Sequence, residues 1–201
     1  MSIRTATPAV LAAAILSIAA CATAPASPAP DAPAGQGDAG APAAVTELPW
    51  LRLAPSQLPG GLALEQRLTF VHGGRRDTVD ALVEADADEV RVVVHAQGQV
   101  AMRLVWNGTS MAETRDPRLP AGVQARRVLN ELQFAYWPTT AIAAALPAGW
   151  TLQGDAAHRV LVHGDPARPV LEVEHRDGGE VRITYPGEAL ELWIESREVR
   201  P

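Results

Sequence analysis

The chain has no lysine and a single cysteine, Cys21, among its 201 residues. One thiol cannot form a disulfide within the chain, and it cannot supply the paired thiolates of a structural zinc site. The 17 basic residues are therefore all arginines, and against 23 acidic residues they leave a formal net charge of −6. No segment gathers them into the basic patch that a nucleic-acid interface requires, so we expect no nucleic-acid partner.

Signatures of catalysis and of metal binding are also scarce. Ser56, Ser110 and Ser196 lie outside any Gly-x-Ser-x-Gly turn, and the lone cysteine has no catalytic arrangement around it. The five histidines include no pair four residues apart on a predicted helix, although a meeting of His163 and His175 across neighbouring strands stays open. We therefore predict that the protein is not an enzyme and has no metal site and no cofactor.

One apolar run lies near the N-terminus, after Arg4, and it ends in the sequence Ile18-Ala19-Ala20-Cys21. The run is too short to span a membrane and resembles the signal peptide of bacterial lipoprotein precursors. The resemblance implies cleavage after residues 1–20 and lipidation of the Cys21 thiol; ordinary cleavage next to an unmodified cysteine is the alternative. Ala22 replaces the aspartate that retains such lipoproteins at the inner membrane. The predicted location is the outer membrane, lipid-anchored and facing the periplasm.

The next segment, residues 22–44, reads ATAPASPAPDAPAGQGDAGAPAA. It has almost no bulky apolar side chain, so it cannot bury enough surface to offset the entropy of ordering. Its alternating prolines favour an extended chain of roughly 3 Å per residue. We assign residues 21–47 to the lipidated cysteine and a tether, and residues 48–201 to one folded domain.

Four successive segments of that domain alternate apolar and polar residues, which predicts strands with one buried face. They begin at Leu62, Val79, Val90 and Val100. Gly73-Gly74 and Asn107-Gly108 supply turn signals, so the four strands are expected to form an antiparallel meander.

The period then changes to three and four residues, which predicts a helix from near Val123 to Trp137 and a short second helix over 140–146. Strands are expected again at 151–153, 159–163, 170–175, 181–185 and 190–195. The predicted fold class is α+β, mainly β: an antiparallel sheet wrapped over helices that are inserted after the first four strands.

Two strings of this domain carry a family resemblance. Residues 131–138 read ELQFAYWP and residues 190–195 read LELWIE. They resemble a family of outer-membrane lipoproteins that are encoded beside fatty-acid-synthase-like genes for aryl polyene pigments. That family is similar to LolB, the outer-membrane receptor that accepts lipoproteins from the carrier LolA. The resemblance implies an incomplete antiparallel β-barrel, a LolA/LolB-like half-barrel, whose concave face holds acyl chains under a helical lid.

One departure from LolB narrows the expected role. LolB-type proteins insert acyl chains with a projecting loop that exposes a leucine, whereas the turns at 73–77 and 86–89 are polar or tight here. A dedicated role with one lipid or polyene conjugate is therefore favoured over a general lipoprotein receptor.

The chain has five tryptophans but only two phenylalanines and two tyrosines. Tryptophans can line an apolar cavity or fill a packed core, and both alternatives stay open. The predicted ligand-binding residues are those on the strand and helix faces that should meet: Met102, Leu104, Trp106, Leu132, Phe134, Tyr136 and Trp137. We expect them to bind a long apolar ligand, such as an acyl chain, a lipoprotein or an aryl polyene lipid, that passes from a LolA-like carrier to the outer membrane. The alternative is a structural or assembly lipoprotein with a solid interior that docks on another cell-envelope protein.

Overall fold

The computed structural model describes residues 47–119 and 123–199. They belong to one compact unit, residues 41–201. The predicted signal peptide, Cys21 and nearly all of the predicted tether lie outside the described residues. Every member of the hydrophobic core cluster falls within the compact unit, so we expect 41–201 to fold on its own, and the experiments below use it. None of the described helices is long and apolar enough to cross a membrane.

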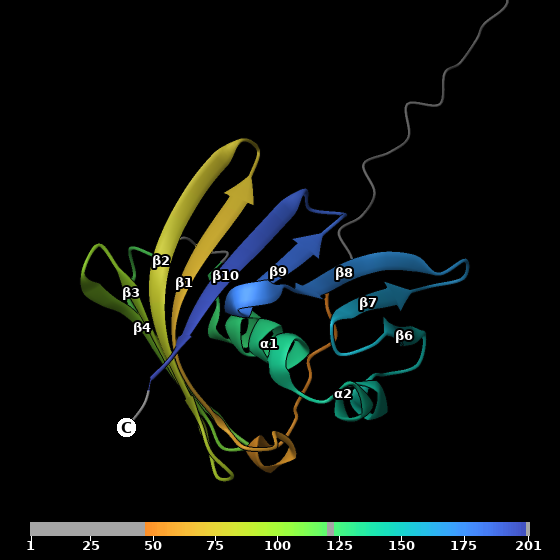
Figure 1. The fold of residues 1–201 in the computed structure, drawn as a ribbon, viewed down its shortest axis with the longest axis horizontal. Helices are drawn as coiled ribbons and strands as arrows, with labels where there is room; N and C mark the ends of the chain where they lie inside the picture. Colours follow the sequence, from red (N-terminus) through yellow and green to blue (C-terminus); the bar gives the residue numbers. More distant parts are fainter. Residues whose placement is uncertain (1–46, 120–122, 200–201) are drawn as a thin grey trace, which may run out of the picture. The chain divides into compact units, whose positions relative to one another are not determined.

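Within the described residues, ten antiparallel strands form one sheet in the order β5-β4-β3-β2-β1-β10-β9-β8-β7-β6 (Figure 1). The strands are β1 (Leu62–His72), β2 (Arg75–Ala85), β3 (Val90–Ala96), β4 (Gln99–Trp106), β5 (Met111–Arg115), β6 (Trp150–Gly154), β7 (His158–His163), β8 (Arg168–His175), β9 (Glu180–Tyr185) and β10 (Leu190–Glu198). Two meanders, β1–β5 and β6–β10, are joined where β1 pairs with β10. The edge strands β5 and β6 do not pair with each other, so the sheet stays open, as an incomplete barrel requires.

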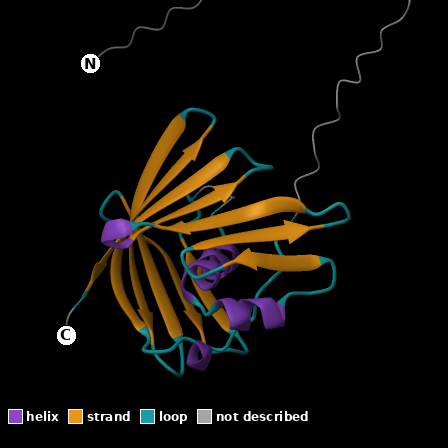
Figure 2. Cartoon of the chain, turned by 45° about the vertical axis from the view of Figure 1, so that its right-hand side comes forward, coloured by secondary structure: helices purple, strands orange, loops and turns teal. Residues whose placement is uncertain are grey.

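Two α-helices lie within the described residues, α1 (Ala125–Tyr136) and α2 (Thr139–Ala145), together with the short 3-10 turns η1 (Pro55–Gln57) and η2 (Asp177–Gly179). Figure 2 shows α1 inside the curve of the strands. Pro138 separates the two helices because it has no amide donor and disfavours a helical residue before it. The side chains of Leu129 and Phe134 are fully buried, so α1 is a core element rather than a helix packed on a surface.

The predicted alternation of β2 and β3 is confirmed. Val83 lies opposite Val92 in the register, and both are buried on the face that meets α1. The opposite face carries ion pairs such as that between Arg67 and Asp80. This division into one apolar and one charged face is what the two-residue period of a strand produces.

Two details of the first meander differ from the prediction. Strand β5 was not predicted, so the helices follow five strands rather than four; it is a largely exposed edge strand whose residues show no apolar alternation. Val100 begins a predicted strand whose alternation puts it on the same buried face as Met102, yet Val100 is 39% exposed. The register between β3 and β4 shifts at Val94 and His95, and such a bulge turns the residues beyond it to the other face.

Candidate functional site

An extended segment at the start of the described chain, residues 47–54, crosses the molecule beside α1; we call it the strap. Leu51 and Leu53 of the strap are almost completely buried. Asn130 of α1 binds the strap twice: the amide of Leu51 donates to its Oδ1 over 3.0 Å, and its Nδ2 donates to the carbonyl of Pro49 over 2.9 Å. The strap is therefore fixed against the helix by one buried side-chain amide.

Three further side chains donate to the backbone of the strap. Nε1 of Trp106 and Nε2 of Gln133 both reach the carbonyl of Leu53, over 2.8 and 3.2 Å. Nε1 of Trp137 reaches the carbonyl of Ala54 over 3.1 Å. Since Trp106 belongs to β4 and Gln133 to α1, the strap lies between the sheet and the helix. Among the described residues, no backbone-to-backbone hydrogen bond joins the strap to a strand or to α1.

The structure brings the seven predicted ligand-binding residues together. Met102, Leu104 and Trp106 line the buried face of β4, and the other four come from α1 and the residue after it. All are at most 6% exposed except Tyr136, which is partly buried and packs against the same core cluster. In this conformation the strap contacts two of these residues, so an apolar ligand reaches the most deeply buried of them only after protein atoms move.

Tyr136 marks the edge of this apolar region with a small polar group. Its hydroxyl accepts a hydrogen bond from Nε2 of Gln66 over 2.8 Å and lies 3.1 Å from Oγ of Ser196. Burial raises the pKa of Tyr136, so the phenol stays protonated and can donate.

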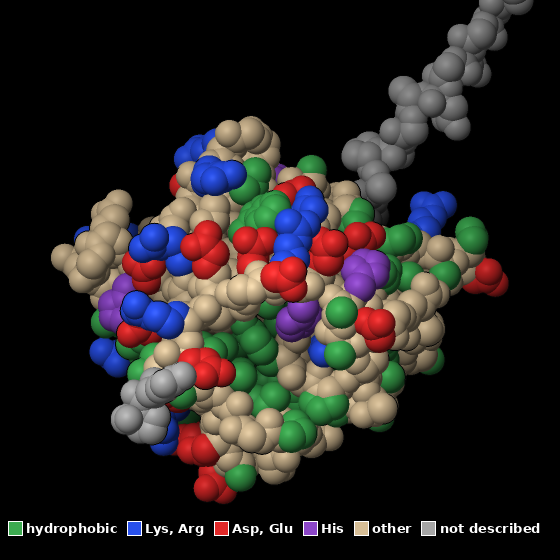
Figure 3. All heavy atoms as spheres, in the orientation of Figure 1, with side chains coloured by type: hydrophobic (Ala, Val, Ile, Leu, Met, Phe, Trp, Pro, Cys, Tyr) green, Lys and Arg blue, Asp and Glu red, His purple; other side chains and the backbone are tan. Residues whose placement is uncertain are grey.

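Figure 3 shows hydrophobic side chains gathered in a hollow beside the C-terminal end of β10, next to α1.

The C-terminal end of α1 is held by two inward-facing side chains of the second meander. Arg159 of β7 donates from one terminal nitrogen to the carbonyls of Phe134, over 2.7 Å, and Trp137, over 2.9 Å. Nε2 of His175 in β8 donates to the carbonyl of Ala135 over 2.9 Å. A cation at this end of a helix also meets the negative end of the helix dipole. These contacts fix the position of the helix that carries three of the seven predicted ligand-binding residues.

His175 gives the domain a testable pH dependence. Burial lowers its pKa below the ordinary value of 6.5, and the bond to Ala135 offsets this only in part. The unfolded chain therefore binds more protons than the folded one just below pH 6.5, so the stability from this residue is present above that value and is lost as the pH falls. We expect His175→Gln, which keeps an N–H donor, to lose less stability than the parent between pH 7 and pH 5 in urea titrations. Equal losses in the two proteins would contradict this, and other titrating groups cancel in the comparison.

A second buried polar cluster ties the middle of α1 to the turn between β9 and β10. The hydroxyl of Tyr185 donates to the carboxylate of Glu131, and Nε of Arg127 donates to the same carboxylate over 3.1 Å. Arg127 also bonds to Glu188 over 3.1 Å. Burial raises the pKa of Glu131, against the lowering effect of Tyr185 and Arg127. The polar groups of this cluster bond to one another, which indicates a structural role in holding the helix in place.

The comparison with protein families decides the family. The family model described as "Protein of unknown function (DUF3261)" matches residues 63–198. The chain belongs to the DUF3261 family. The matched part of this DUF3261 protein runs from β1 to β10, and the strap lies before it.

Other comparisons add little to that assignment. No curated protein matches the DUF3261 chain. Among solved structures, the crystal structure of a DUF1329 family protein from Desulfovibrio piger ATCC 29098, at 1.75 Å resolution, is similar at 10% identity and a TM-score of 0.25. The similarity covers 71% of this chain and 87% of that chain. At this TM-score the likeness carries no argument, so the fold assignment rests on the strand order given above.

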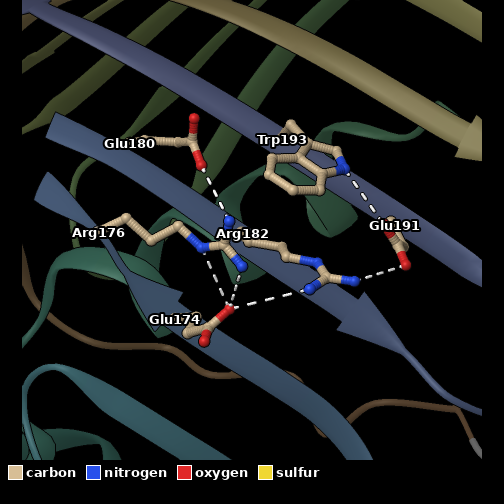
Figure 4. Close-up of polar contacts among 6 residues, drawn as sticks. All are labelled: Glu174, Arg176, Glu180, Arg182, Glu191 and Trp193. Carbon is tan, nitrogen blue, oxygen red and sulfur yellow. Dashed lines mark hydrogen bonds and ion pairs between the residues drawn. The ribbon is translucent and has the colours of Figure 1, made fainter. Parts of the chain in front are cut away.

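The outer face of β8–β10 in the DUF3261 protein is charged. Figure 4 shows six side chains there, Glu174, Arg176, Glu180, Arg182, Glu191 and Trp193. The guanidinium groups of Arg176 and Arg182 each lie 5.0 Å from the centre of the Trp193 ring. A hollow of about 190 Å³ nearby is lined by His158, Glu172, Glu174, Arg182 and Thr184. Because the charges are paired across strands, this face is well suited to contact with water and stabilises the sheet.

The histidines do not gather. His163 packs on Trp150 with ring centres 4.3 Å apart, and it pairs with Arg168, whereas His175 pairs with Val181. His163 therefore lies beside the first residue of β8, whereas His175 is its last residue. The two side chains do not meet across neighbouring strands. No group of three or more potential metal-ligating side chains occurs among the residues that the structure describes.

The residues that sequence reasoning missed are those whose role depends on distant partners. The strap leucines gave only a short Leu-Arg-Leu alternation, and Asn130 and Gln133 stood as polar interruptions of the helical pattern. A polar residue inside an otherwise buried helix face was the available signal, since such groups require a hydrogen-bond partner.

Proposed function

We propose that this DUF3261 protein is an outer-membrane lipoprotein, anchored through Cys21, that binds a long apolar ligand on the concave side of its open sheet. The observation that carries the proposal is the apolar hollow beside α1 and β10 (Figure 3). A monomer of this size seldom leaves a hollowed apolar area without a use. The predicted half-barrel of the LolB type offers such a face to acyl chains.

Binding would be the whole mechanism. Each methylene that leaves water contributes about 0.8 kcal/mol, so a ligand moves along a gradient of affinity from a periplasmic LolA-like carrier to this protein and then to the bilayer. Gln66, Tyr136 and Ser196 place a protonated hydroxyl at the edge of the apolar face, where the polar end of a ligand would lie. The family resemblance in residues 131–138 makes an aryl polyene lipid one candidate, beside an acyl chain or an acylated protein.

The rival function is docking on another envelope protein. Trp193 between Arg176 and Arg182 on the outer face favours it, because tryptophan and arginine dominate the binding energy of many protein interfaces. In that case the interior needs no ligand.

A pair of aromatic-to-aspartate variants separates the two functions. Residues 41–201, without the lipidated cysteine, are purified gently and analysed by native mass spectrometry, then titrated with the fluorescent fatty acid cis-parinaric acid. We expect a co-purifying or titratable acyl ligand in the parent and in Trp193→Asp. Tyr136→Asp places a charge in the apolar face and should weaken binding at least tenfold.

A parent that stays free of ligand after incubation with membrane lipids would overturn the proposal. Capture of an envelope protein that is lost in Trp193→Asp would then support docking instead. Circular dichroism of each variant shows that the fold is kept.

A further inference from the structure

We infer that the strap occupies the ligand-binding face as an internal competitor, and that an N-acyl ligand binds by displacing it. The inference rests on the proposed function, since it concerns the same face. The inference starts from one observation: the strap contacts Trp106 and Trp137, two of the residues that we predict to bind the ligand.

The way in which the strap is held makes it removable as a unit. Its polar contacts with α1, β4 and Trp137 all involve side chains: hydrogen bonds with Asn130, Gln133, Trp106 and Trp137, and an ion pair of 3.7 Å between Glu47 and Arg126. The sheet keeps all its ladder bonds when the strap leaves, since no described backbone bond joins the two. The strap also precedes the family-matched residues 63–198. Release therefore leaves the ten-stranded sheet and α1 paired as they are.

The groups left behind define the chemistry of the ligand. Three N–H donors, on Trp106, Gln133 and Trp137, currently meet the carbonyl oxygens of Leu53 and Ala54. A ligand that takes the place of the strap must supply carbonyl oxygens to these donors, because buried donors without partners are costly.

Gln133 supplies a second, independent observation. Its side chain is fully buried, and its Oε1 has no hydrogen-bond partner. A buried acceptor of this kind is satisfied by a ligand N–H. An acyl chain in amide linkage offers the carbonyl oxygen and the N–H together, and its tail replaces the apolar side chains of Leu51 and Leu53.

Competition between the strap and the ligand has a measurable consequence. We call the form in which the strap has left the ligand-binding face the open form. If only a small fraction of the molecules is open, a ligand that binds only this form has a higher apparent dissociation constant. Asn130→Ala removes two hydrogen bonds to the strap without touching a predicted ligand-binding residue. We expect it to raise the open fraction and tighten binding about tenfold.

The test compares cis-parinaric acid binding, and its displacement by N-palmitoylglycine, in the parent, Asn130→Ala and a matched control. Asp155→Ala is the control, because it also removes two hydrogen bonds between a side chain and the backbone, here in the turn between β6 and β7. Hydrogen exchange of the Leu51 amide is followed in the same samples. The inference expects tighter binding in Asn130→Ala alone, and faster exchange at Leu51 when N-palmitoylglycine is added.

Two results would overturn the inference. Equal binding in all proteins, with Leu51 still protected, overturns the competition and leaves the proposed function standing. Binding in none of them overturns both. Should Asn130→Ala fail to fold, Arg52→Ala takes its place, since it removes a bond of 2.8 Å from the strap to the carbonyl of Thr109 and must tighten binding in the same direction.

Discussion

Replacement of both Leu51 and Leu53 by alanine is expected to lower the free energy of unfolding of residues 41–201 by about 5 kcal/mol. Leu51 is fully buried and Leu53 is 2% exposed, and a leucine-to-alanine change in a core costs about 2–5 kcal/mol. We take the lower part of that range for each because an extended segment can move into the space that is left. Domains have a total stability of about 5–15 kcal/mol, so a large fraction of the variant should be unfolded at 37 °C.

Urea titration followed by tryptophan fluorescence measures this, since Trp106 and Trp137 lie under the strap. The matched control is Arg52→Ala, between the two leucines, where the side chain is outside the core and a change below about 1 kcal/mol is expected. A double variant as stable as the parent would show that the strap contributes nothing to the core.

The same figures bear on the competition between strap and ligand. An acyl chain with roughly 14 methylenes contributes about 11 kcal/mol when it is fully buried, which exceeds the roughly 5 kcal/mol expected from the two leucines of the strap. We therefore expect displacement of the strap to become more favourable as the acyl chain becomes longer. In the binding experiments, long acyl chains should bind measurably, whereas chains below a certain length should not bind.

The strands and helices that the sequence predicted are those in which a local pattern is sufficient evidence. Val90, Val92 and Val94 alternate with residues that are not fully buried, and the structure buries all three. Pro138 predicted the break between the helices, because its ring excludes a continuous helix whatever surrounds it. The order of these elements predicted an antiparallel sheet over helices, and the family resemblance implied that the sheet stays open.

Features that depend on partners far along the chain gave no such pattern. Strand β5 is exposed on both faces over most of its length, so it lacks the alternation by which strands are recognised, although the turn at Asn107-Gly108 indicated a hairpin. The bulge that exposes Val100 is set by pairing with β3. The strap has no regular structure, and its place was visible only once α1 and β4 had been positioned.

The role of Arg159 was likewise not visible in the sequence. Its substitution is expected to have the second large effect on the stability of the domain. In the sequence it reads as a polar residue at the start of a strand, yet it is 5% exposed and bonds to the last carbonyls of α1. Burial lowers its pKa, but a guanidinium stays charged in proteins. Arg159→Met keeps an unbranched side chain of shorter reach and removes the charge and both hydrogen bonds.

We expect Arg159→Met to lower the free energy of unfolding by about 3 kcal/mol. A hydrogen bond to a charged group contributes about 1.5–3 kcal/mol, and two carbonyls lose their donor. The cost of burying the charge disappears in the variant, which keeps the net effect near the lower end of the sum. Urea titration at pH 7 measures the loss, and near-ultraviolet circular dichroism reports whether Trp137 keeps its packing.

Arg159→Lys is the informative partner of that variant. Nε of Arg159 is buried without a hydrogen-bond partner, and a single terminal nitrogen makes both bonds to the helix. An ammonium group can in principle replace that nitrogen, so lysine should recover more than half of the lost stability. If the Arg159→Met variant is as stable as the parent, the cost of desolvating the charge equals the free energy that the two hydrogen bonds contribute. If the Arg159→Lys variant is no more stable than Arg159→Met, the shape of the guanidinium matters more than its charge. Only the planar group then fits between the sheet and the end of α1.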